Sequence, residues 1–153
     1  EFAIHDGCAA RWAATATPGD TIEATVQGTA FSLPDPAPEH LYLVGDAASL
    51  PAVNSLFDAA GEIPADVWLE YAHDGERDLP VRAGARHRVT WVPRRDGGRH
   101  LVDTVCAALP AATRAYYWVA CEAASTRAIA RHVRKGLGVD KARVSTLGYW
   151  SAA

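Results

Sequence analysis

The feature that most constrains this fold is a continuous apolar run at residues 41–44, followed directly by Gly45 and Asp46. A strand with one solvated face alternates apolar and polar side chains, so an uninterrupted run indicates a strand buried on both faces. Strands of this kind occur in parallel sheets that carry helices on each side. The run therefore predicts the first strand of an α/β domain.

Strand and helix patterns alternate along the rest of the chain. Residues 49–60 are predicted to be a helix, with Ser49 as its N-cap, Pro51 in the first turn and Gly61 as its stop. Further strands are predicted at residues 67–71, 87–92, 116–120 and 144–149, and further helices at residues 101–109 and 122–135. This alternation is typical of a doubly wound parallel sheet, which we expect over residues 39–153.

The first part of the chain has a different pattern. Turn residues surround two loosely alternating runs at residues 21–26 and 29–33, which suggests antiparallel strands. Residues 1–33 are too short to form such a domain alone, so we expect the C-terminal tail of an antiparallel β-barrel domain. Residues 34–38 contain three prolines and are predicted to be a stiff linker. The chain has no Met, and we interpret it as a piece of a longer protein.

Composition narrows the function classes. The 153 residues include 15 Lys and Arg and 18 Asp and Glu, and this net charge of −3 argues against a nucleic-acid-binding domain. No apolar run approaches the roughly 18 residues that a membrane span needs. Cys8, Cys106 and Cys121 are widely spaced, so neither a zinc site nor a disulfide framework is indicated. We expect a monomer with reduced thiols in the cytoplasm and no metal site.

In an open parallel sheet, ligands bind beyond the carboxyl ends of the strands. This rule points to residues 45–51, 70–73, 93–95 and 120–122. The first segment joins a strand to a helix, where free N–H groups could hold a pyrophosphate. Its candidate binding residues are Gly45, Asp46, Ala48, Ser49, Leu50 and Pro51. The segment contains neither GxGxxG nor a P-loop motif, and a glycine is common in such turns for geometry alone.

Two groups of arginines are candidate anion sites. Arg94 and Arg95 follow a strand and could pair with a 2′-phosphate, although an exposed turn has the same composition. Arg127, Arg131 and Arg134 recur at helical spacing and form one basic stripe, which is either a solvated helix face or a site for an anionic substrate. No catalytic residue is assigned, because no nucleophile lies in a recognisable motif with a base.

Several segments resemble the motifs of one protein family. Residues 44–53, VGDAASLPAV, resemble a GDETALPAI motif, residues 117–123, YWVACEA, resemble WVAGEA, and residues 90–94, TWVPR, resemble TWLHR. Residues 144–150 are similar to VSxxGYW, and residues 9–20 to PASRWAxxARPGD. By this ordered series the chain resembles the siderophore-interacting proteins, which are flavin-dependent ferric-siderophore reductases.

The resemblance implies a two-domain enzyme of the ferredoxin-reductase type, in which an N-terminal barrel binds FAD and a C-terminal α/β domain binds NADPH or NADH. Hydride would pass from nicotinamide to flavin, and electrons would pass from flavin to the iron of a ferric siderophore. Reduction would release the iron inside the cell. The cofactors carry this chemistry, and the protein supplies positioning and electrostatics.

The resemblance also implies which residues contact the cofactors. Residues 45–51 would border the NAD(P)H pyrophosphate, and Arg94, with Arg95, would meet a 2′-phosphate. Tyr149 and Trp150 would be aromatic lids close to the flavin, or alternatively a pair packed in the core. The residues expected near the nicotinamide are Ala120, Cys121 and Glu122. The expected remnant of the FAD pyrophosphate loop comprises Gly7, Ala9, Ala10 and Trp12.

Three departures from the family pattern bear on function. Cys121 stands where the family has Gly, and its side chain would narrow the nicotinamide approach or offer a thiol there. Residues 5–8 are shorter than the family's glycine-rich loop, with Cys8 in place of Pro, and the Arg-x-Tyr-Ser/Thr flavin motif is missing. We therefore expect this chain alone to be inactive and not to hold FAD tightly. A non-catalytic nucleotide-binding or interaction module, and a flavin reductase with another acceptor, remain as alternatives.

Overall fold

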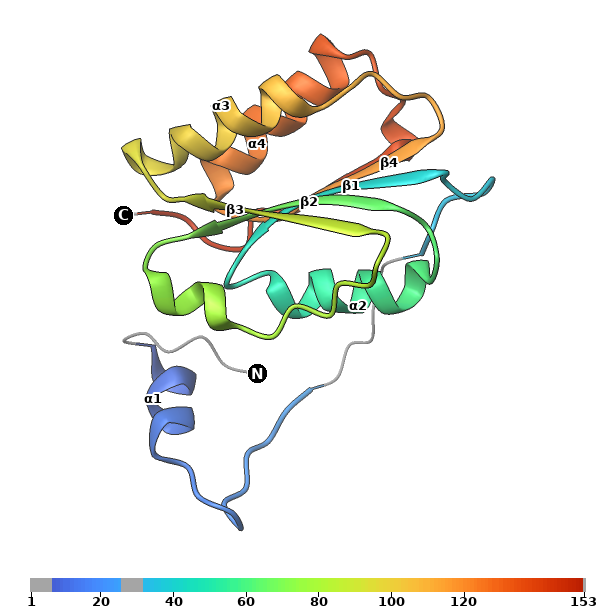
Figure 1. Ribbon diagram of the computed structural model, residues 1–153. Helices are drawn as coiled ribbons and strands as arrows, with labels where there is room; N and C mark the ends of the chain where they lie inside the picture. Colours follow the sequence, from blue (N-terminus) through green and yellow to red (C-terminus); the bar gives the residue numbers. More distant parts are fainter. Residues whose placement is uncertain (1–6, 26–31, 153) are drawn as a thin grey trace. The chain divides into compact units, whose positions relative to one another are not determined.

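The structure is a computed structural model that describes residues 7–25 and 32–152. The chain divides into two compact units, residues 1–32 and residues 33–153. The described part of the first unit contains helix α1 (Cys8–Thr15), with Gly7 at its N-cap. The second unit contains the sheet and the remaining helices (Figure 1).

The second unit is built on a five-stranded sheet in the order β3-β2-β1-β4-β5. Every neighbouring pair of strands is parallel. The strands are β1 (His40–Asp46), β2 (Ala65–Tyr71), β3 (His87–Pro93), β4 (Ala115–Val119) and β5 (Val144–Thr146). The chain adds β2 and β3 on one side of β1 and then crosses over to add β4 and β5 on the other. The predicted parallel sheet is confirmed.

Helices cover both faces of the sheet, as the predicted doubly wound fold requires. Helix α2 (Leu50–Ala60) lies on one face, and α3 (Arg99–Ala108) and α4 (Ala123–Arg131) lie together on the other (Figure 1). The continuous apolar run of β1 is buried from both sides, because Leu43 and Val44 are at most 1% exposed. Strand β4 is buried along its whole length, whereas the edge strand β3 is half-exposed at most positions.

The core between the sheet and the α3–α4 layer is apolar. The sheet supplies side chains such as Val44, Tyr117 and Val119, and the helices supply Leu101, Val105 and Ile129 among others. All of these six residues are buried almost completely. At roughly 1.5–3 kcal/mol for each fully buried large apolar side chain, this layer contributes much of the stability of the domain.

The helix boundaries follow local chemistry, with one correction. Gly61 ends α2 with a positive φ of 59°, which a glycine adopts without steric cost. Ser49 occupies the N-cap position of α2, but the prediction that its side chain caps the helix is wrong. Its hydroxyl turns back to the end of β1, where it accepts from the Asp46 N–H at 2.9 Å. The predicted helix 122–135 is an α-helix only to Arg131, and a π-helical turn follows at His132–Gly136.

Two strand predictions need correction. Residues 21–25 form no strand, so the prediction of a strand at residues 21–26 is wrong for the described residues. Residues 29–31 of the predicted strand 29–33 lie outside the described residues, as does residue 26, and residues 32 and 33 are not part of a strand. A loose alternation forms a strand only where a partner accepts its hydrogen bonds. The last strand ends at Thr146 rather than at residue 149. The chain nevertheless continues beside β4, because the Leu147 and Tyr149 N–H groups donate to Val119 and Cys121 carbonyls.

Among the described residues, no helix is both long and apolar enough to cross a membrane.

Candidate functional site

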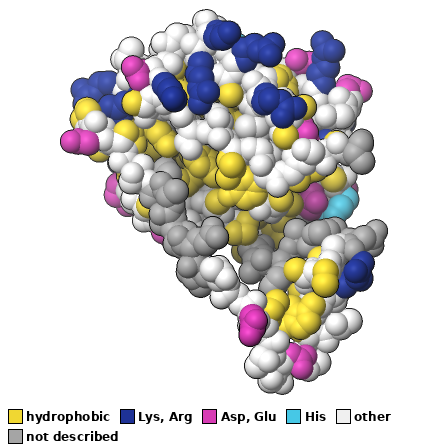
Figure 2. All heavy atoms as spheres, turned by 180° about the vertical axis from the view of Figure 1, so that it is seen from behind, with side chains coloured by type: hydrophobic (Ala, Val, Ile, Leu, Met, Phe, Trp, Pro, Cys, Tyr) yellow, Lys and Arg dark blue, Asp and Glu magenta, His cyan; other side chains and the backbone are white. Residues whose placement is uncertain are grey.

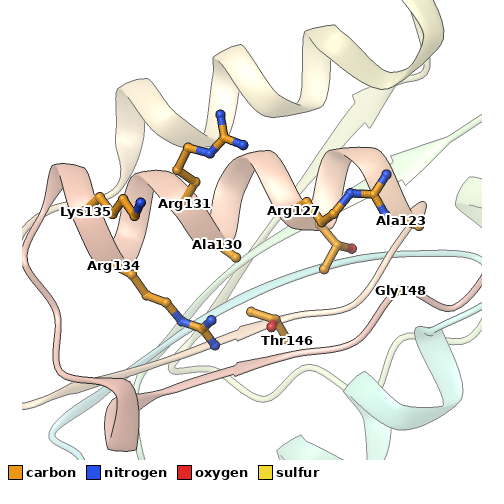
Figure 3. Close-up of a pocket in the computed structure, with 9 residues that line it drawn as sticks. Ala123, Arg127, Ala130, Arg131, Arg134, Lys135, Thr146 and Gly148 are labelled. Atoms are coloured by element: carbon orange, nitrogen blue, oxygen red, sulfur yellow. The ribbon is translucent and has the colours of Figure 1, made fainter.

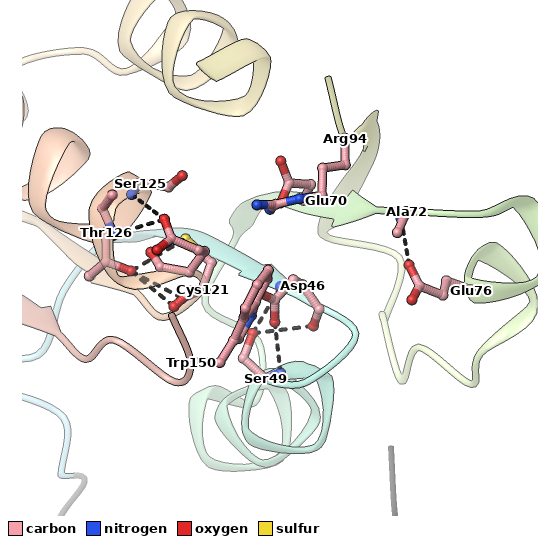
Figure 4. Close-up of polar contacts among 12 residues, drawn as sticks. Asp46, Ser49, Glu70, Ala72, Glu76, Arg94, Cys121, Ser125, Thr126 and Trp150 are labelled. Atoms are coloured by element: carbon pink, nitrogen blue, oxygen red, sulfur yellow. Dashed lines mark hydrogen bonds and ion pairs between the residues drawn. The ribbon is translucent and has the colours of Figure 1, made fainter. Parts of the chain in front are cut away.

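The carboxyl ends of the strands meet at one edge of the sheet, and the order in which strands are added reverses between β1 and its neighbour β4. In open α/β sheets, a crevice opens at such a reversal because the flanking connections run to opposite faces. Polar side chains from β1, β2, the end of β3 and the last residues of the chain gather there (Figure 4). The members that carry the argument are Asp46, Glu70, Arg94 and Trp150.

Asp46 ends β1 and is only 6% exposed. One carboxylate oxygen accepts from the indole N–H of Trp150 at 2.8 Å, and the other accepts from the Ser49 N–H at 3.1 Å. Burial raises the pKa of Asp46, and these hydrogen bonds oppose the rise. The Asp46 carboxylate therefore already binds the Ser49 N–H, a donor at the start of α2 that was expected to bind a pyrophosphate.

The packing of the same turn explains why residue 45 is a glycine. A Cβ at this position would lie 2.5 Å from the Ser49 hydroxyl oxygen, which no real side chain tolerates. Leu50 and Ser49 are buried, whereas Ala48 and Pro51 are exposed. Ala47 is partly exposed, so Ala47, Ala48 and Pro51 are the side chains of this turn that reach solvent.

Glu70 and Arg94 form the charged floor of the crevice. Glu70 is 2% exposed, and one of its carboxylate oxygens pairs with the Arg94 guanidinium. The guanidinium carbon lies 4.8 Å from the ring centroid of Trp150, a cation–π distance. Burial raises the pKa of Glu70, and the positive charge of Arg94 opposes this rise. Arg94 thus links a buried carboxylate to the aromatic ring above it.

The second carboxylate oxygen of Glu70, Oε1, is buried and has no hydrogen-bond partner among the described residues. It lies near Gly98, whose φ is +94° and where a Cβ would come within 2.7 Å of the Ser125 hydroxyl oxygen. A larger residue at position 98 would displace the neighbouring side chains. Sequence patterns did not indicate Gly98 or Ser125 as site residues, and the only local signal was the pair of glycines at residues 97–98.

Glu122 and Cys121 lie where β4 gives way to α4. The Glu122 carboxylate caps the helix, because it accepts from the backbone N–H groups of Ala124 and Ser125 at 2.8 and 2.9 Å. Burial works against its ionisation, but these N–H donors hold the pKa of Glu122 below its usual value. This carboxylate has a structural role in the helix terminus.

The Cys121 side chain points into the core and has no exposed surface. Burial raises the pKa of its thiol to about 12. Its sulfur lies 3.4 Å from the Thr126 hydroxyl oxygen. Of the two consequences expected for a cysteine here, the structure supports neither a reactive thiol nor a side chain that narrows the crevice. Ala120, before it, is also fully buried.

The last two aromatic residues lie at the mouth of the crevice. Tyr149 is 40% exposed and Trp150 is 37% exposed, so the alternative that they form a core pair is wrong. The Trp150 carbonyl accepts from the Ala123 N–H at 2.8 Å, which ties the end of the chain to the start of α4. Arg95 is exposed and forms no ion pair among the residues that the structure describes.

The remaining candidates belong to helix α1 of the first unit and, in the second unit, to α4 and the turn after it. Helix α1 of the first unit carries Ala9, Ala10 and Trp12, with Gly7 as its N-cap. Arg127, Arg131 and Arg134 come together with Lys135 on one side of α4, along an open hollow (Figure 3). Within the described parts of the chain, no three His, Cys, Asp or Glu side chains are close enough to hold a metal ion.

These features define an open, doubly wound α/β domain with polar side chains gathered at the carboxyl edge of its parallel sheet. The sequence profile of the siderophore-interacting protein family matches residues 38–153, and the chain belongs to this family.

Relatives and solved structures agree with this family. The chain is 35% identical to the mycobactin import ATP-binding/permease protein IrtA of Mycolicibacterium smegmatis and 30% identical to that of Mycobacterium tuberculosis. Each match covers 99% of this chain but only 18% of the relative. The siderophore-interacting protein SipS of Aeromonas hydrophila has the same fold, with a TM-score of 0.74 at 27% identity, over 99% of this chain and 65% of SipS. The siderophore-interacting protein of Acinetobacter baumannii shares the fold with a TM-score of 0.75 at 20% identity, over 99% of this chain and 63% of that one.

Proposed function

We propose that this chain is the NAD(P)H-binding part of a flavin-dependent ferric-siderophore reductase. The observation that supports the proposal best is the position of the family-like segments of the α/β domain, which begin at residue 44 and end at residue 150. Their polar and aromatic residues gather at one edge of the sheet, where Asp46, Arg94, Glu122 and Trp150 lie at or beside the carboxyl ends of different strands. A role connected with siderophores follows from the family to which the chain belongs.

Two features of the crevice suit a nicotinamide dinucleotide: it lies at the carboxyl edge of the sheet, and the side next to β3 carries positive charge. Arg95 is exposed beyond β3 and has no ion-pair partner in the described part of the chain, so a 2′-phosphate can approach it. Arg94 forms an ion pair with Glu70, and in this proposal it positions the Trp150 ring and does not bind the 2′-phosphate. The unpartnered Glu70 Oε1 is an acceptor that a ribose hydroxyl or a water could satisfy after local movement of Arg94.

The start of α2 fits a pyrophosphate less well than the sequence predicts. Asp46 accepts the Ser49 N–H, and Pro51 has no N–H to offer. We therefore assign the nucleotide's contacts in this turn to the exposed surface of Ala48 and Pro51. When bound, NAD(P)H supplies a hydride, and FAD accepts it and delivers electrons to the ferric siderophore. In this proposal the chain binds the nucleotide and covers it with Trp150, and Cys121 takes no part in chemistry.

Helix α1 is suited to an anion such as the FAD pyrophosphate. Gly7 offers no side chain to accept from the first N–H groups of the helix, and no acidic residue lies in the first turn. The positive end of a helix dipole favours an anion. We propose that Gly7, Ala9, Ala10 and Trp12 belong to the flavin site, and that the rest of that site lies in a barrel domain. We place the reaction in the cytoplasm.

The nucleotide assignment can be tested on this chain by titration with NADPH and NADH. We expect Arg95→Gln to weaken NADPH binding about tenfold, because a charge-assisted hydrogen bond to the 2′-phosphate is lost. NADH binding should hardly change. Arg82→Gln, which lies beside α2 and pairs with Asp58, is the matched control. Equal losses for both nucleotides would contradict the role of Arg95.

The redox assignment needs the chain joined to a flavin-binding barrel of this family. Under anaerobic conditions, we expect NADPH or NADH to bleach the flavin absorbance, and addition of a ferric siderophore to restore it. Failure of both nucleotides to bleach a bound flavin would overturn the proposal. Nucleotide binding without bleaching would favour a non-catalytic binding module. The observation that supports this alternative is that the polar groups at the sheet edge already bind one another: Trp150 donates to Asp46, and Arg94 pairs with Glu70. Re-oxidation only by other acceptors would favour a different flavin reductase.

A further inference from the structure

A hollow of about 470 Å³ lies between α4 and the last strand of the sheet (Figure 3). Its lining contains none of the crevice residues Asp46, Glu70, Arg94 and Trp150. Four cationic side chains from α4 and the turn after it border the hollow, and β5 and the segment beyond it form the other side. The residues that matter are Arg127, Arg131, Arg134, Lys135, Thr146 and Gly148.

The geometry of the hollow depends on close packing beneath it. A Cβ at Gly148 would lie 3.0 Å from the Ala123 Cβ, so the last segment approaches the start of α4 more closely than a larger residue permits. From the other end, Arg134 reaches across the hollow towards Thr146 (Figure 3). The Thr146 hydroxyl and the guanidinium thus face the same space.

The four charges are not neutralised by the protein. Several arginines elsewhere in the domain have acidic partners, as Arg82 has Asp58 and Arg88 has Asp66, although Arg95 has none among the described residues. No ion pair joins Arg127, Arg131, Arg134 or Lys135 to an acidic group within residues 7–25 and 32–152. Basic side chains are prominent over the helical layer in the space-filling view as well (Figure 2). In a chain with a net charge of −3, this is a local concentration of available positive charge.

Helix stability does not account for these residues. Cations near the C-terminal end of a helix interact favourably with its dipole, which explains Arg134 and Lys135. Arg127 lies at the middle of α4, outside the last turn, where the dipole gives no such benefit. Arg131 stands four residues from both Arg127 and Lys135, and like charges at this spacing destabilise a helix. A bound anion would relieve this repulsion.

We propose that the hollow beside α4 binds a compact anion that carries at least two carboxylate or phosphate groups. Guanidinium groups match both kinds of oxyanion in bidentate geometry. Arg127 and Lys135 are eight residues apart, about 12 Å along the helix axis, so one monovalent group cannot reach all four cations. The volume lies within the range of roughly 300–1,000 Å³ typical of small-ligand sites.

Two sources could supply such an anion. A phosphorylated metabolite carries phosphate groups, and a ferric chelate with carboxylate arms carries the other kind. The second source rests on the proposed function, because it makes Arg127, Arg131 and Arg134 residues of the siderophore site. The anion site itself stands on the hollow and its charges, so its failure and that of the reductase proposal are separate results.

The test is a titration of the isotope-labelled chain by NMR with three probes: citrate, gallium(III) citrate as a redox-inert ferric analogue, and inorganic pyrophosphate. We expect saturable shifts of the backbone amides of residues 123–135, 146 and 148. Arg127→Gln with Arg134→Gln should weaken binding at least about tenfold, whereas Arg82→Gln on the opposite face should leave it within about twofold. Circular dichroism checks that each variant is folded.

The probes separate the two sources. Preference for pyrophosphate identifies a phosphate ligand, and preference for citrate or its gallium complex identifies a carboxylate ligand; either result supports the site. The proposal is overturned if the shifts are confined to residues 45–51, because the anion then occupies the nucleotide crevice. It is also overturned if no probe gives saturable shifts, or if Arg82→Gln weakens binding as much as the double substitution.

Discussion

The Glu70–Arg94 pair offers the sharpest test of how this crevice is held together. Glu70 is 2% exposed and the side chain of Arg94 is 19% exposed, so neither charge is well solvated. Arg94→Met keeps most of the aliphatic volume and removes the positive charge. The Glu70 carboxylate is then buried without a counter-ion, and one of its oxygens already lacks a partner. Removal of one partner of a buried ion pair lowers the free energy of unfolding by roughly 3–5 kcal/mol.

We expect a loss near the lower end of this range, about 3 kcal/mol, because the exposed part of Arg94 lets water reach the site. For a protein of this size, the loss corresponds to a melting temperature lower by roughly 6–12 °C. Urea denaturation followed by far-UV circular dichroism measures it directly. Tryptophan fluorescence is a poor probe here, since Arg94 lies over the Trp150 ring.

The loss should depend on pH with a defined sign. Burial raises the pKa of Glu70 above its ordinary value of 4.5 in the folded chain, and removal of Arg94 raises the pKa further. Above the folded pKa, the variant carries the full cost of the unpaired charge. As the pH falls through the folded pKa towards 4.5, the carboxylate takes up a proton and the cost disappears. The difference from the parent chain should therefore be largest at neutral pH and should shrink in acid.

Glu70→Gln provides the control, because it removes the charge and leaves the shape. The double variant with Arg94→Met should recover most of the stability that Arg94→Met loses at neutral pH. If the single and double variants unfold at the same urea concentration, and the loss does not change with pH, the electrostatic explanation is refuted. The role of Arg94 would then be packing alone.

Three further predictions concern the same edge of the sheet. Trp150→Phe removes the indole N–H donor to the buried carboxylate at the end of β1, so it should cost about 1.5 kcal/mol in urea denaturation at neutral pH and less in acid; a pH-independent loss would contradict this reason. Cys121 should resist alkylation in the folded chain while the exposed Cys8 reacts, and peptide mass mapping that finds both labelled at equal rates would disprove its burial. Gly98→Ala should cost about 1–2 kcal/mol more than Gly97→Ala, because both positions have positive φ but only a Cβ at Gly98 meets a neighbouring side chain at 2.7 Å. Similar melting temperatures for the two alanine variants would show that the neighbouring side chain simply moves aside.

Much of the fold could be read from local patterns. The apolar run of β1 and the stop at Gly61 depend on residues next to one another, and both predictions are confirmed. The strand predicted at residues 21–26 is absent from the described residues 21–25 for the complementary reason. A short loosely alternating run becomes a strand only if another strand pairs with it, and no local pattern reports whether that partner exists.

The candidate site was predicted in outline and corrected in detail. The rule for open parallel sheets led to the ends of β1, β2, β3 and β4, and polar residues do gather at that edge. The rule does not say which side chains bind one another there. Arg94 and Arg95 are equivalent in sequence, yet in the structure Arg94 forms an ion pair with Glu70 and Arg95 is exposed.

The sequence alone determined the class of the domain, its strand and helix segments and its family resemblance, because periodicity, turn residues and motifs are properties of neighbouring positions. Only the tertiary structure decided that Trp150 donates to Asp46 across 104 positions of sequence, and that Cys121 faces the core. Both results depend on strand order, which places the end of the chain beside β4 and β4 beside β1. Long-range contacts of this kind depend on how whole strands and helices pack together, and the sequence of any single segment does not determine that packing.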